Sequence, residues 1–199
     1  MIKKLFDVIF AVLLIIFLSP IFLVIYVYLT FAIGSPVIFK QRRVGYKGKE
    51  FILYKFRTMA ITKDPNILKS SKFERKRVLI KTKFLRGTRL DEIPQLINIL
   101  RGDLSFVGPR PLLKEYIPIY SREQKKRLDV QAGITGWSQI HCKKELTWKE
   151  KFKLDVWYVK NQSFLLDLKI IFFTVIFFLS SLLKADKNFF ISDKFNGNN

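Results

Sequence analysis

Apolar residues fill positions 8–33 almost without interruption, and Asp7 is the only charged residue between Lys4 and Lys40. A helix needs ~20 apolar residues to cross a bilayer, so this run is long enough to do so. The apolar region of a secretory signal covers only ~7–15 residues and leads to a small-residue cleavage site, which is not evident here. The pattern therefore predicts a membrane element that the protein keeps.

Ser19 and Pro20 interrupt this run near its middle. Pro20 has no N–H to donate and disturbs the helix around it, and residues 8–18 alone would give about 17 Å of helix, only about half of a ~30 Å hydrocarbon core. The Ser19 hydroxyl can bond a carbonyl that the break frees. Basic residues flank the run on both sides: Lys3 and Lys4 before it, and Lys40, Arg42 and Arg43 after it. Because positive flanks stay on the cytoplasmic side, we expect a re-entrant helix broken at Ser19 and Pro20, with a kinked membrane-spanning helix as the alternative.

The next segment predicts a small β-hairpin followed by a helix. Residues 36–39 and 51–54 form the strands, and Gly45 and Gly48 lie in a basic loop between them. Residues 60–83 are polar and basic without periodicity, and we expect loop with room for a short helix. Residues 90–100 carry Leu and Ile at helical spacing, and Gly102 follows as a stop signal.

The second half of the chain predicts short surface helices. Capping boxes begin at Ser121 and Thr147, and the second opens a helix with one apolar stripe. Residues 137–140 are expected to be extended after a turn at 133–136. Residues 170–183 form an uncharged run that is short for a membrane span and suits an interfacial or buried helix.

These patterns together predict an α+β, membrane-associated (monotopic) protein with a re-entrant helix, a small β-hairpin and several amphipathic surface helices. Residues 1–39 would form the membrane helix and its connection. Residues 40–185 would form one cytoplasmic domain with interfacial helices, and residues 186–199 a polar C-terminal tail.

The amino-acid composition limits the kinds of molecule that the protein can bind. The 199 residues include 36 Lys and Arg against 16 Asp and Glu, a formal net charge of +20, while 49% are hydrophobic. Such apolar content excludes intrinsic disorder. The single cysteine, Cys142, excludes an internal disulfide framework, and the single histidine, His141, argues against a zinc site. A basic surface on an apolar body leaves anionic lipid surfaces or nucleic acid as partners.

The most informative segment for chemistry is 86–111, where an acid pair lies among arginines. Asp91 and Glu92 begin the predicted helix, since Pro94 is tolerated only in a first turn. A helix cap is the simplest role for such a pair. The arginines of the same segment instead indicate a site for phosphate and a divalent cation. They are Arg86, Arg89, Arg101 and Arg110. Prolines on both sides of Arg110 would hold its guanidinium toward a phosphate with little loss of entropy.

Other residues give weaker signals. Lys55 and Arg57 are two residues apart, so their side chains lie on one face of the second predicted strand. They are either phosphate ligands or cations of an ordinary solvated strand edge. Asp155 lies on the polar side of its helix, as a salt-bridge partner or as a second acid of the site. The sequence has no Walker A motif and no Gly-x-Gly-x-x-Gly fingerprint, which argues against the common forms of ATP-driven and dinucleotide chemistry.

Six motifs occur in an order that resembles a known enzyme family. They are Ser19-Pro20 within the apolar run and the segments 55–59, 90–96, 102–111, 133–137 and 155–159, and the block 90–111 is highly specific. Over nearly the whole chain the sequence is similar to the bacterial sugar transferases, which are small monotopic phosphoglycosyl transferases. It most resembles the group that starts N-linked glycan assembly with diacetylbacillosamine phosphate.

The resemblance implies a reaction at the cytoplasmic face of the bacterial inner membrane, the initiating step of glycoconjugate assembly. Such enzymes transfer a sugar 1-phosphate from a UDP-sugar to polyprenol (undecaprenyl) phosphate with Mg²⁺ and release UMP. By resemblance, Asp91 is the nucleophile that forms an aspartyl phospho-sugar, and Glu92 holds the metal with Asp91 or assists the acceptor. The candidate substrate-binding residues are Arg86, Arg110, Lys55, Arg57, Lys143 and Asp155. Lys143 stands where related enzymes often have arginine, so the cation is kept without its bidentate fork.

Two other classes of function stay open at this level. The net charge and three tryptophans suit a membrane-anchored nucleic-acid binder, although the sequence lacks a recognition-helix or stacking-platform motif. The apolar ends suit a non-catalytic membrane scaffold, in which an acid pair among arginines is hard to explain. The resemblance instead implies a UDP-sugar, a polyprenol phosphate and the lipid bilayer as partners, and no nucleic acid. It specifies neither the sugar nor whether the chain forms a homodimer.

Overall fold

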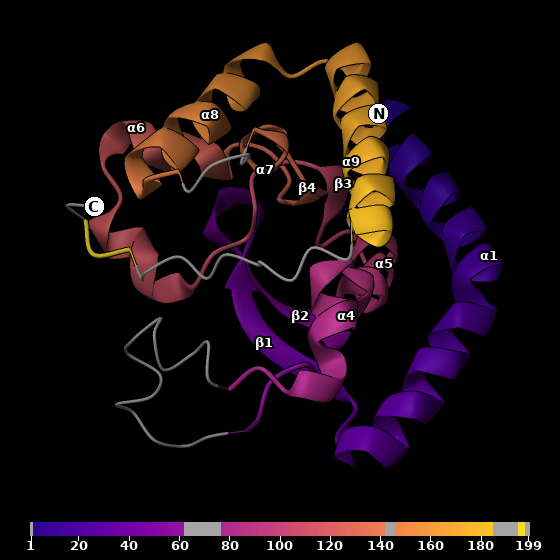
Figure 1. Ribbon diagram of the computed structural model, residues 1–199. Coiled ribbons are helices and arrows are strands. Elements are labelled where there is room, and N and C mark those ends of the chain that lie inside the picture. The colour runs from indigo at the N-terminus through magenta and orange to yellow at the C-terminus, as the bar shows by residue number, and fades with distance from the viewer. Residues whose placement is uncertain (1, 62–76, 142–145, 185–194, 198–199) are drawn as a thin grey trace.

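The computed structural model describes residues 2–61, 77–141, 146–184 and 195–197. A long helix, α1 (Ile2–Ile33), curves along one side of a body built from short elements (Figure 1). The body holds an antiparallel hairpin, β1 (Ile38–Val44) with β2 (Glu50–Phe56), and a parallel pair, β3 (Ser105–Val107) with β4 (Gly133–Thr135). The predicted α+β class is confirmed.

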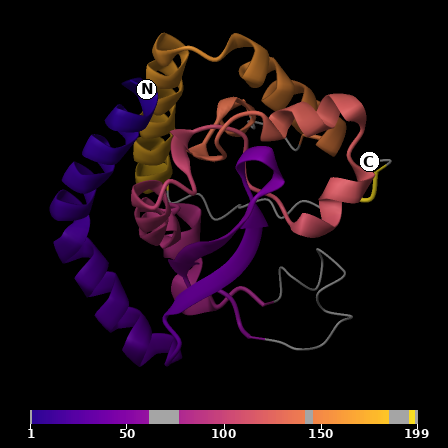
Figure 2. The same cartoon turned by 180° about the vertical axis from the view of Figure 1, so that it is seen from behind.

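Helices of very different length connect and cover these strands. The short ones are η1 (Tyr46–Gly48), η2 (Ile80–Thr82), α4 (Lys83–Gly87), η3 (Leu90–Gln95), α5 (Leu96–Leu100), η4 (Lys114–Ile119), α6 (Arg122–Lys125), η5 (Lys126–Leu128) and α7 (Trp137–Ile140). The two longer ones are α8 (Trp148–Asn161) and α9 (Phe164–Lys184). Figures 1 and 2, seen from opposite sides, both show α9 beside the N-terminal half of α1.

Pro20 lies inside α1, which runs through it as one continuous helix and bends. A proline cannot donate to the carbonyl four residues before it, which here belongs to Ile16. The Ser19 hydroxyl donates to that carbonyl oxygen at 2.8 Å, so the freed acceptor is satisfied as predicted. The helix therefore continues through the interruption expected at Ser19 and Pro20.

Both ends of α1 are attached to the same body. At the N-terminal end, the Lys3 ammonium donates to Asp167 Oδ2 of α9 at 2.6 Å and to the Val107 carbonyl at 3.1 Å. At the C-terminal end, the buried Arg57 guanidinium donates to the carbonyls of residues 33 and 34 at 2.6 Å each. The Tyr28 hydroxyl donates to the Lys81 carbonyl at 2.9 Å. The helix is thus attached to the body at both of its ends.

The hairpin has longer strands than the sequence predicted, because basic residues extend β1 on its exposed face. Its register pairs Ile38 with Phe56 and Val44 with Glu50, and the predicted Gly45–Gly48 loop contains η1. The fully buried Asn98 of α5 continues the outer edge of β2. Its side chain accepts from the Tyr54 N–H at 3.1 Å and donates to the Ile52 carbonyl at 2.7 Å.

The prediction of extended chain over 137–140 is wrong, because these residues form α7. The extended segment comes earlier, as β4. Gly136 is extended and begins the helix, and Trp137 then stacks on Trp157 of α8 with ring centroids 4.6 Å apart. The buried Ser138 hydroxyl donates to Asp155 of α8 at 2.6 Å. These contacts with α8 favour a helical turn over an extended strand that would have no further partner.

The capping boxes predicted at Ser121 and Thr147 are confirmed at the starts of α6 and α8. The helix predicted over 90–100 divides into the 3-10 helix η3, which contains Pro94, and the α-helical α5. Phe195, within the segment expected as a polar tail, is buried in an aromatic cluster. Its neighbours are Tyr116, Tyr120, Trp148 and Phe152.

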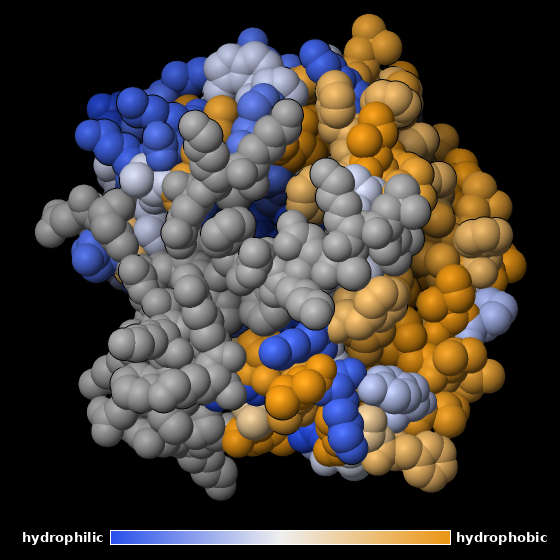
Figure 3. All heavy atoms as spheres, viewed as in Figure 1, coloured by the Kyte–Doolittle hydropathy of each residue, from blue (hydrophilic) through white to orange (hydrophobic). Residues whose placement is uncertain are grey.

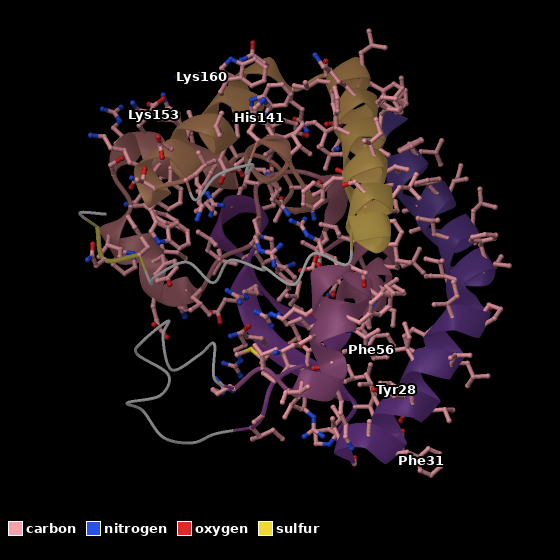
Figure 4. All side chains as sticks on the ribbon, in the orientation of Figure 1. Tyr28, Phe31, Phe56, His141, Lys153 and Lys160 are labelled. Carbon is pink, nitrogen blue, oxygen red and sulfur yellow. The ribbon has the colours of Figure 1, made fainter. Side chains whose placement is uncertain are left out.

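One side of the molecule is apolar. Hydrophobic side chains gather over α1 and α9 in the space-filling view (Figure 3). Exposed members include Phe17 and Phe31 of α1 and Phe172 and Phe177 of α9. In Figure 4, Phe31 points away from the body at one end of α1, while Lys153 and Lys160 lie on α8 at the other end of the view. The described chain has one helix, α1, that is long and apolar enough to cross a membrane. This apolar band of α1 and α9 supports membrane association.

Candidate active site

Asp91 and Glu92 are held over the hairpin by η3, which packs against β2. Arg89 precedes η3 in a left-handed conformation, with φ 58° and ψ 17°, which turns the chain sharply after α4. The Asn98 bonds to β2 anchor the helix that follows η3. The acid pair therefore has a rigid support on both sides.

The segment that carries Arg110 approaches the acid pair from β3. A Cβ atom at Gly108 would overlap the Gln131 carbonyl oxygen, and one at Gly133 would overlap the Gly108 nitrogen. Both positions must therefore be glycine for the two backbones to lie this close. The Arg110 guanidinium then reaches Glu92, with Nη2 to Oε1 at 2.9 Å.

A buried network holds the backbone of Arg110 in place. The Arg127 guanidinium donates to the Arg110 carbonyl at 2.7 Å and to Asp155 Oδ2 through two nitrogens, at 2.8 and 3.2 Å. Asp155 also accepts from Ser138, and Arg127 donates to the Tyr120 hydroxyl at 3.1 Å. Side chains of Arg127 and Asp155 are 3% and 4% exposed. Asp155 therefore acts on the site through the position of Arg110.

The two acids differ in their surroundings. Burial and the charge of Glu92 raise the pKa of Asp91 to about 6, against the opposing effect of nearby cations. Burial also raises the pKa of Glu92, but the attraction of Arg110, Arg89 and Lys55 outweighs it and lowers that pKa to about 2. Glu92 is thus a permanent anion paired with Arg110. Within the described chain, no residue hydrogen-bonds the Asp91 carboxylate, so its oxygens can reach an incoming ligand.

Lys55 projects from β2 toward the acid pair. Burial lowers its pKa, while the charges of Asp91 and Glu92 raise it, so the three groups share one electrostatic environment. Among described residues its ammonium makes no hydrogen bond or ion pair, and it lies 5.8 Å from the ring centroid of Phe39. A half-buried cation in that state suits an anionic ligand.

A pocket opens beside the acid pair. Its lining residues are Arg43, Leu53, Lys55, Gln95, Arg110, Pro111 and Gly133. Arg43 was not among the residues predicted from the sequence. It follows Arg42 on β1, where no motif distinguished it, and the strand register places it opposite Phe51 of β2. Three cations in one pocket favour a ligand with more than one negative charge.

The other predicted residues lie in different places. Arg86 of α4 lowers the pKa of Asp91 through its charge and donates to Thr58 at 3.5 Å, so it belongs to the site. Arg57 is buried at the end of α1, where its donors bond backbone carbonyls. Arg101, of the same predicted basic cluster, stacks on Tyr54 and donates to its hydroxyl at 2.7 Å. Lys143 lies outside the described residues.

Asp91 and Glu92 are the candidates for holding a magnesium ion. Mg²⁺ is usually bound by one or two carboxylates together with substrate phosphates, and this pair of adjacent carboxylates fits that donor set. In the described ranges, no group of three or more His, Cys, Asp or Glu residues could hold a metal. The residues therefore fit a metal that shares its coordination with a phosphate substrate.

A buried carboxylate among cations, next to an apolar surface, is the arrangement expected of a membrane-associated phosphate-transferring enzyme. The family model of the bacterial sugar transferases matches residues 1–181 of the chain. The chain therefore belongs to this family, as its motifs predicted, and it is an enzyme, a phosphoglycosyl transferase.

Individual relatives agree with this assignment. The chain is 46% identical over 196 residues to the uncharacterized sugar transferase EpsL of Bacillus subtilis, covering 98% of this chain and 96% of EpsL. It is 35% identical over 188 residues to the exopolysaccharide production protein ExoY of Sinorhizobium fredii, with 87% and 83% covered. It is 32% identical over 188 residues to the undecaprenyl-phosphate galactose phosphotransferase of Salmonella typhimurium, covering 86% of this chain but 39% of that protein.

Proposed function

We propose that this enzyme transfers a sugar 1-phosphate from a UDP-sugar to undecaprenyl phosphate and releases UMP, in two steps through a phospho-sugar on Asp91. The observation that carries the proposal is the contrast within the acid pair. Glu92 is bound to Arg110, whereas the buried Asp91 carboxylate lies among cations without a hydrogen bond from the described residues. Relatives named as undecaprenyl-phosphate sugar phosphotransferases support the reaction.

In the first step, an Asp91 oxygen attacks the phosphorus that carries the sugar. The bond to UMP breaks, and its electron pair leaves on the UMP phosphate. A carboxylate can approach a phosphate only when cations offset their repulsion, and Lys55, Arg86 and Arg110 supply this offset. Magnesium held by Asp91 or Glu92 would neutralise further charge on the diphosphate. The pocket of Arg43, Lys55 and Arg110 is the proposed seat of the donor diphosphate.

In the second step, an oxygen of the lipid phosphate attacks the same phosphorus. The bond to Asp91 breaks, its electron pair returns to the carboxylate, and the product is a polyprenyl diphospho-sugar. Glu92 stays ionised throughout because Arg110 and its neighbours hold its pKa low. Its proposed roles are to help bind the metal and to keep Arg110 oriented.

The proposed location is the cytoplasmic face of the bacterial inner membrane, with α1 entering one leaflet and returning. The attachments of Lys3 and Arg57 support this topology, because both ends of α1 contact one polar body. The apolar band that continues onto α9 supports an interfacial position for that helix. Glycoconjugate assembly is the proposed pathway class. The resemblance to enzymes of N-linked protein glycosylation stays a prediction, and so does a homodimer.

The direct test is UMP release from a panel of UDP-sugars by the membrane-reconstituted enzyme with Mg²⁺ and undecaprenyl phosphate. Without acceptor, we expect one UMP per enzyme and an intact mass increased by one phospho-sugar. Multiple turnovers should need the acceptor. The two-step proposal would be rejected if no donor gave UMP, or if UMP formed without an increase in the mass of the enzyme.

The rate of the first step should depend on the protonation of Asp91. Because its pKa is raised to about 6, the fraction of reactive carboxylate falls below that pH. We expect kcat/KM for the donor to fall about tenfold per pH unit below pH ~6. In Glu92→Gln the neighbouring negative charge is gone, so this acid limb should move to lower pH, whatever the change in absolute rate. If the acid limb lies at the same pH in wild type and in Glu92→Gln, Asp91 is not the group whose protonation controls the first step.

Pro20 should control the topology of α1. In Pro20→Ala the backbone can again bond the Ile16 carbonyl, and a straighter helix should place the N-terminus across the membrane in part of the molecules. A cysteine at Lys4 in a Cys142→Ser background reports this by labelling from outside. Ser19→Ala, which keeps the proline, is the matched control. Labelling from the cytoplasmic side alone in Pro20→Ala would show that the proline does not set the topology.

A further inference from the structure

Arg89 joins the acid pair to the apolar band. Its backbone is in the left-handed conformation and its side chain is exposed. The guanidinium carbon lies 5.3 Å from the ring centroid of Phe177 on α9. The Phe177 ring is 46% exposed and belongs to the apolar band. Arg89 therefore lies where the site meets the membrane-facing surface.

Arg89 also acts on the acid pair through its charge. It is among the cations that hold the pKa of Glu92 low, so its guanidinium is close enough to Glu92 to interact with it electrostatically. A non-glycine residue in the left-handed region is uncommon, and such conformations occur often at functional sites. The same residue thus contacts an apolar ring and acts on Glu92 through its charge.

The pocket beside the acid pair contains other cations of the site. Lys55 and Arg110 line the pocket together with Arg43, and the described lining of this pocket includes no residue of α1 or α9. The site therefore has a pocket side, reached from the hairpin, and a lipid side, bordered by α9. In the proposed transfer the lipid phosphate attacks after UMP has left, so phospho-Asp91 must be reached from the membrane-facing surface as well as from the pocket.

We propose that Arg89 binds the phosphate of the lipid acceptor, with the hydrocarbon chain lying along the apolar face of α9 near Phe177. This inference rests on the proposed function and assigns the lipid side of the same site. A guanidinium presents paired N–H donors that match phosphate oxygens. It can hold the acceptor beside the phospho-Asp91 while an acceptor oxygen attacks, the bond to Asp91 breaks and its electron pair returns to the carboxylate.

The test separates the two half-reactions in Arg89→Asn. Asparagine adopts the left-handed conformation readily, so the fold should be kept. We expect kcat/KM for undecaprenyl phosphate to fall about tenfold to a hundredfold, as for loss of one hydrogen bond to a charged group. The UMP burst without acceptor should stay within about twofold of wild type, as expected for a group that the first step does not use. Arg89→Lys should restore much of the acceptor kcat/KM.

Arg101→Asn is the matched control, because Arg101 also stacks on an aromatic ring, 5.1 Å from the centroid of Tyr54, on the opposite face of the hairpin from Lys55. It should change neither half-reaction. The assays use phosphatidylcholine vesicles with and without phosphatidylglycerol. A defect in Arg89→Asn that appears only with phosphatidylglycerol would show binding of bulk headgroups and overturn the proposal.

Two further outcomes would also overturn it. An equal fall in both half-reactions would make Arg89 a general support of the acid pair, and no fall would make it a surface residue. Failure of the proposed function looks different, because the wild-type enzyme would then release no UMP in either assay, and the acceptor role of Arg89 would fall with it.

Discussion

Asp91→Asn should abolish transfer and at the same time stabilise the fold. Removal of a covalent nucleophile costs at least about 10⁴-fold in rate where it has been tested in other enzymes. The gain in stability follows from the raised pKa, about 6 in the folded state against 3.8 for the free side chain. Between these values the folded state binds more protons than the unfolded state, so stability falls as pH rises from ~4 to ~6 and does not recover above that range.

Neutral asparagine removes this penalty. At pH 7 the free energy of unfolding should rise by up to about 3 kcal/mol, the equivalent of the pKa shift. Thermal unfolding in detergent at pH 7 and pH 4 measures it, and the difference between variant and wild type should nearly vanish at pH 4. Intact mass after incubation with donor should show no phospho-sugar. A variant that is less stable than wild type at pH 7 would mean that the Asp91 carboxylate is well stabilised and not poised for attack.

Of the substitutions proposed here, Asp155→Ala should lower the free energy of unfolding the most. It leaves the Arg127 guanidinium buried without its carboxylate partner, which typically costs about 3–5 kcal/mol. Arg127 also holds the Arg110 carbonyl, so activity should fall with stability. Glu123→Ala is the control, because Glu123 pairs with Lys160 in an exposed position, where solvent screens an ion pair and little stability is lost.

The measurements for Asp155→Ala are thermal unfolding and the kinetics of UMP release. A normal melting temperature with a raised KM for the donor would support the other interpretation, in which Asp155 contacts substrate. Asp155→Asn, which keeps the shape and acceptor oxygen, should lie between the alanine variant and wild type in both measurements.

Local signals explain how much of the fold was predictable. The parts predicted correctly depend on contacts between residues three or four positions apart. These are the capping boxes at Ser121 and Thr147 and the hydrogen bond of Ser19 beside the proline of α1. The α7 helix was missed because its stabilising contacts, Trp137 on Trp157 and Ser138 on Asp155, join distant parts of the chain. The burial of Phe195 depends on a distant aromatic cluster in the same way.

In the candidate site, too, the residues close in sequence were predicted, and the contacts that join distant segments were not. Asp91, Glu92 and Arg110 lie close in sequence, and their grouping was predicted. Arg43 lines the pocket from a strand far from the acid pair in sequence, and the contact of Arg89 with Phe177 spans 88 residues of chain. Arg57 and Asp155 have the residue types of ligands, but their hydrogen bonds to the chain itself give them structural roles that no local pattern distinguishes.

The double attachment of α1 has a consequence for how the enzyme meets its lipid substrate. In the proposed topology, a helix held to the body by Lys3 at one end and by Arg57 at the other would fix the height of the site relative to the bilayer and keep the protein on the membrane between turnovers. For the proposed transfer, enzyme and acceptor then find each other by lateral diffusion within one plane. Turnover should accordingly follow the mole fraction of acceptor in the membrane, and diluting the vesicles in buffer should leave it unchanged.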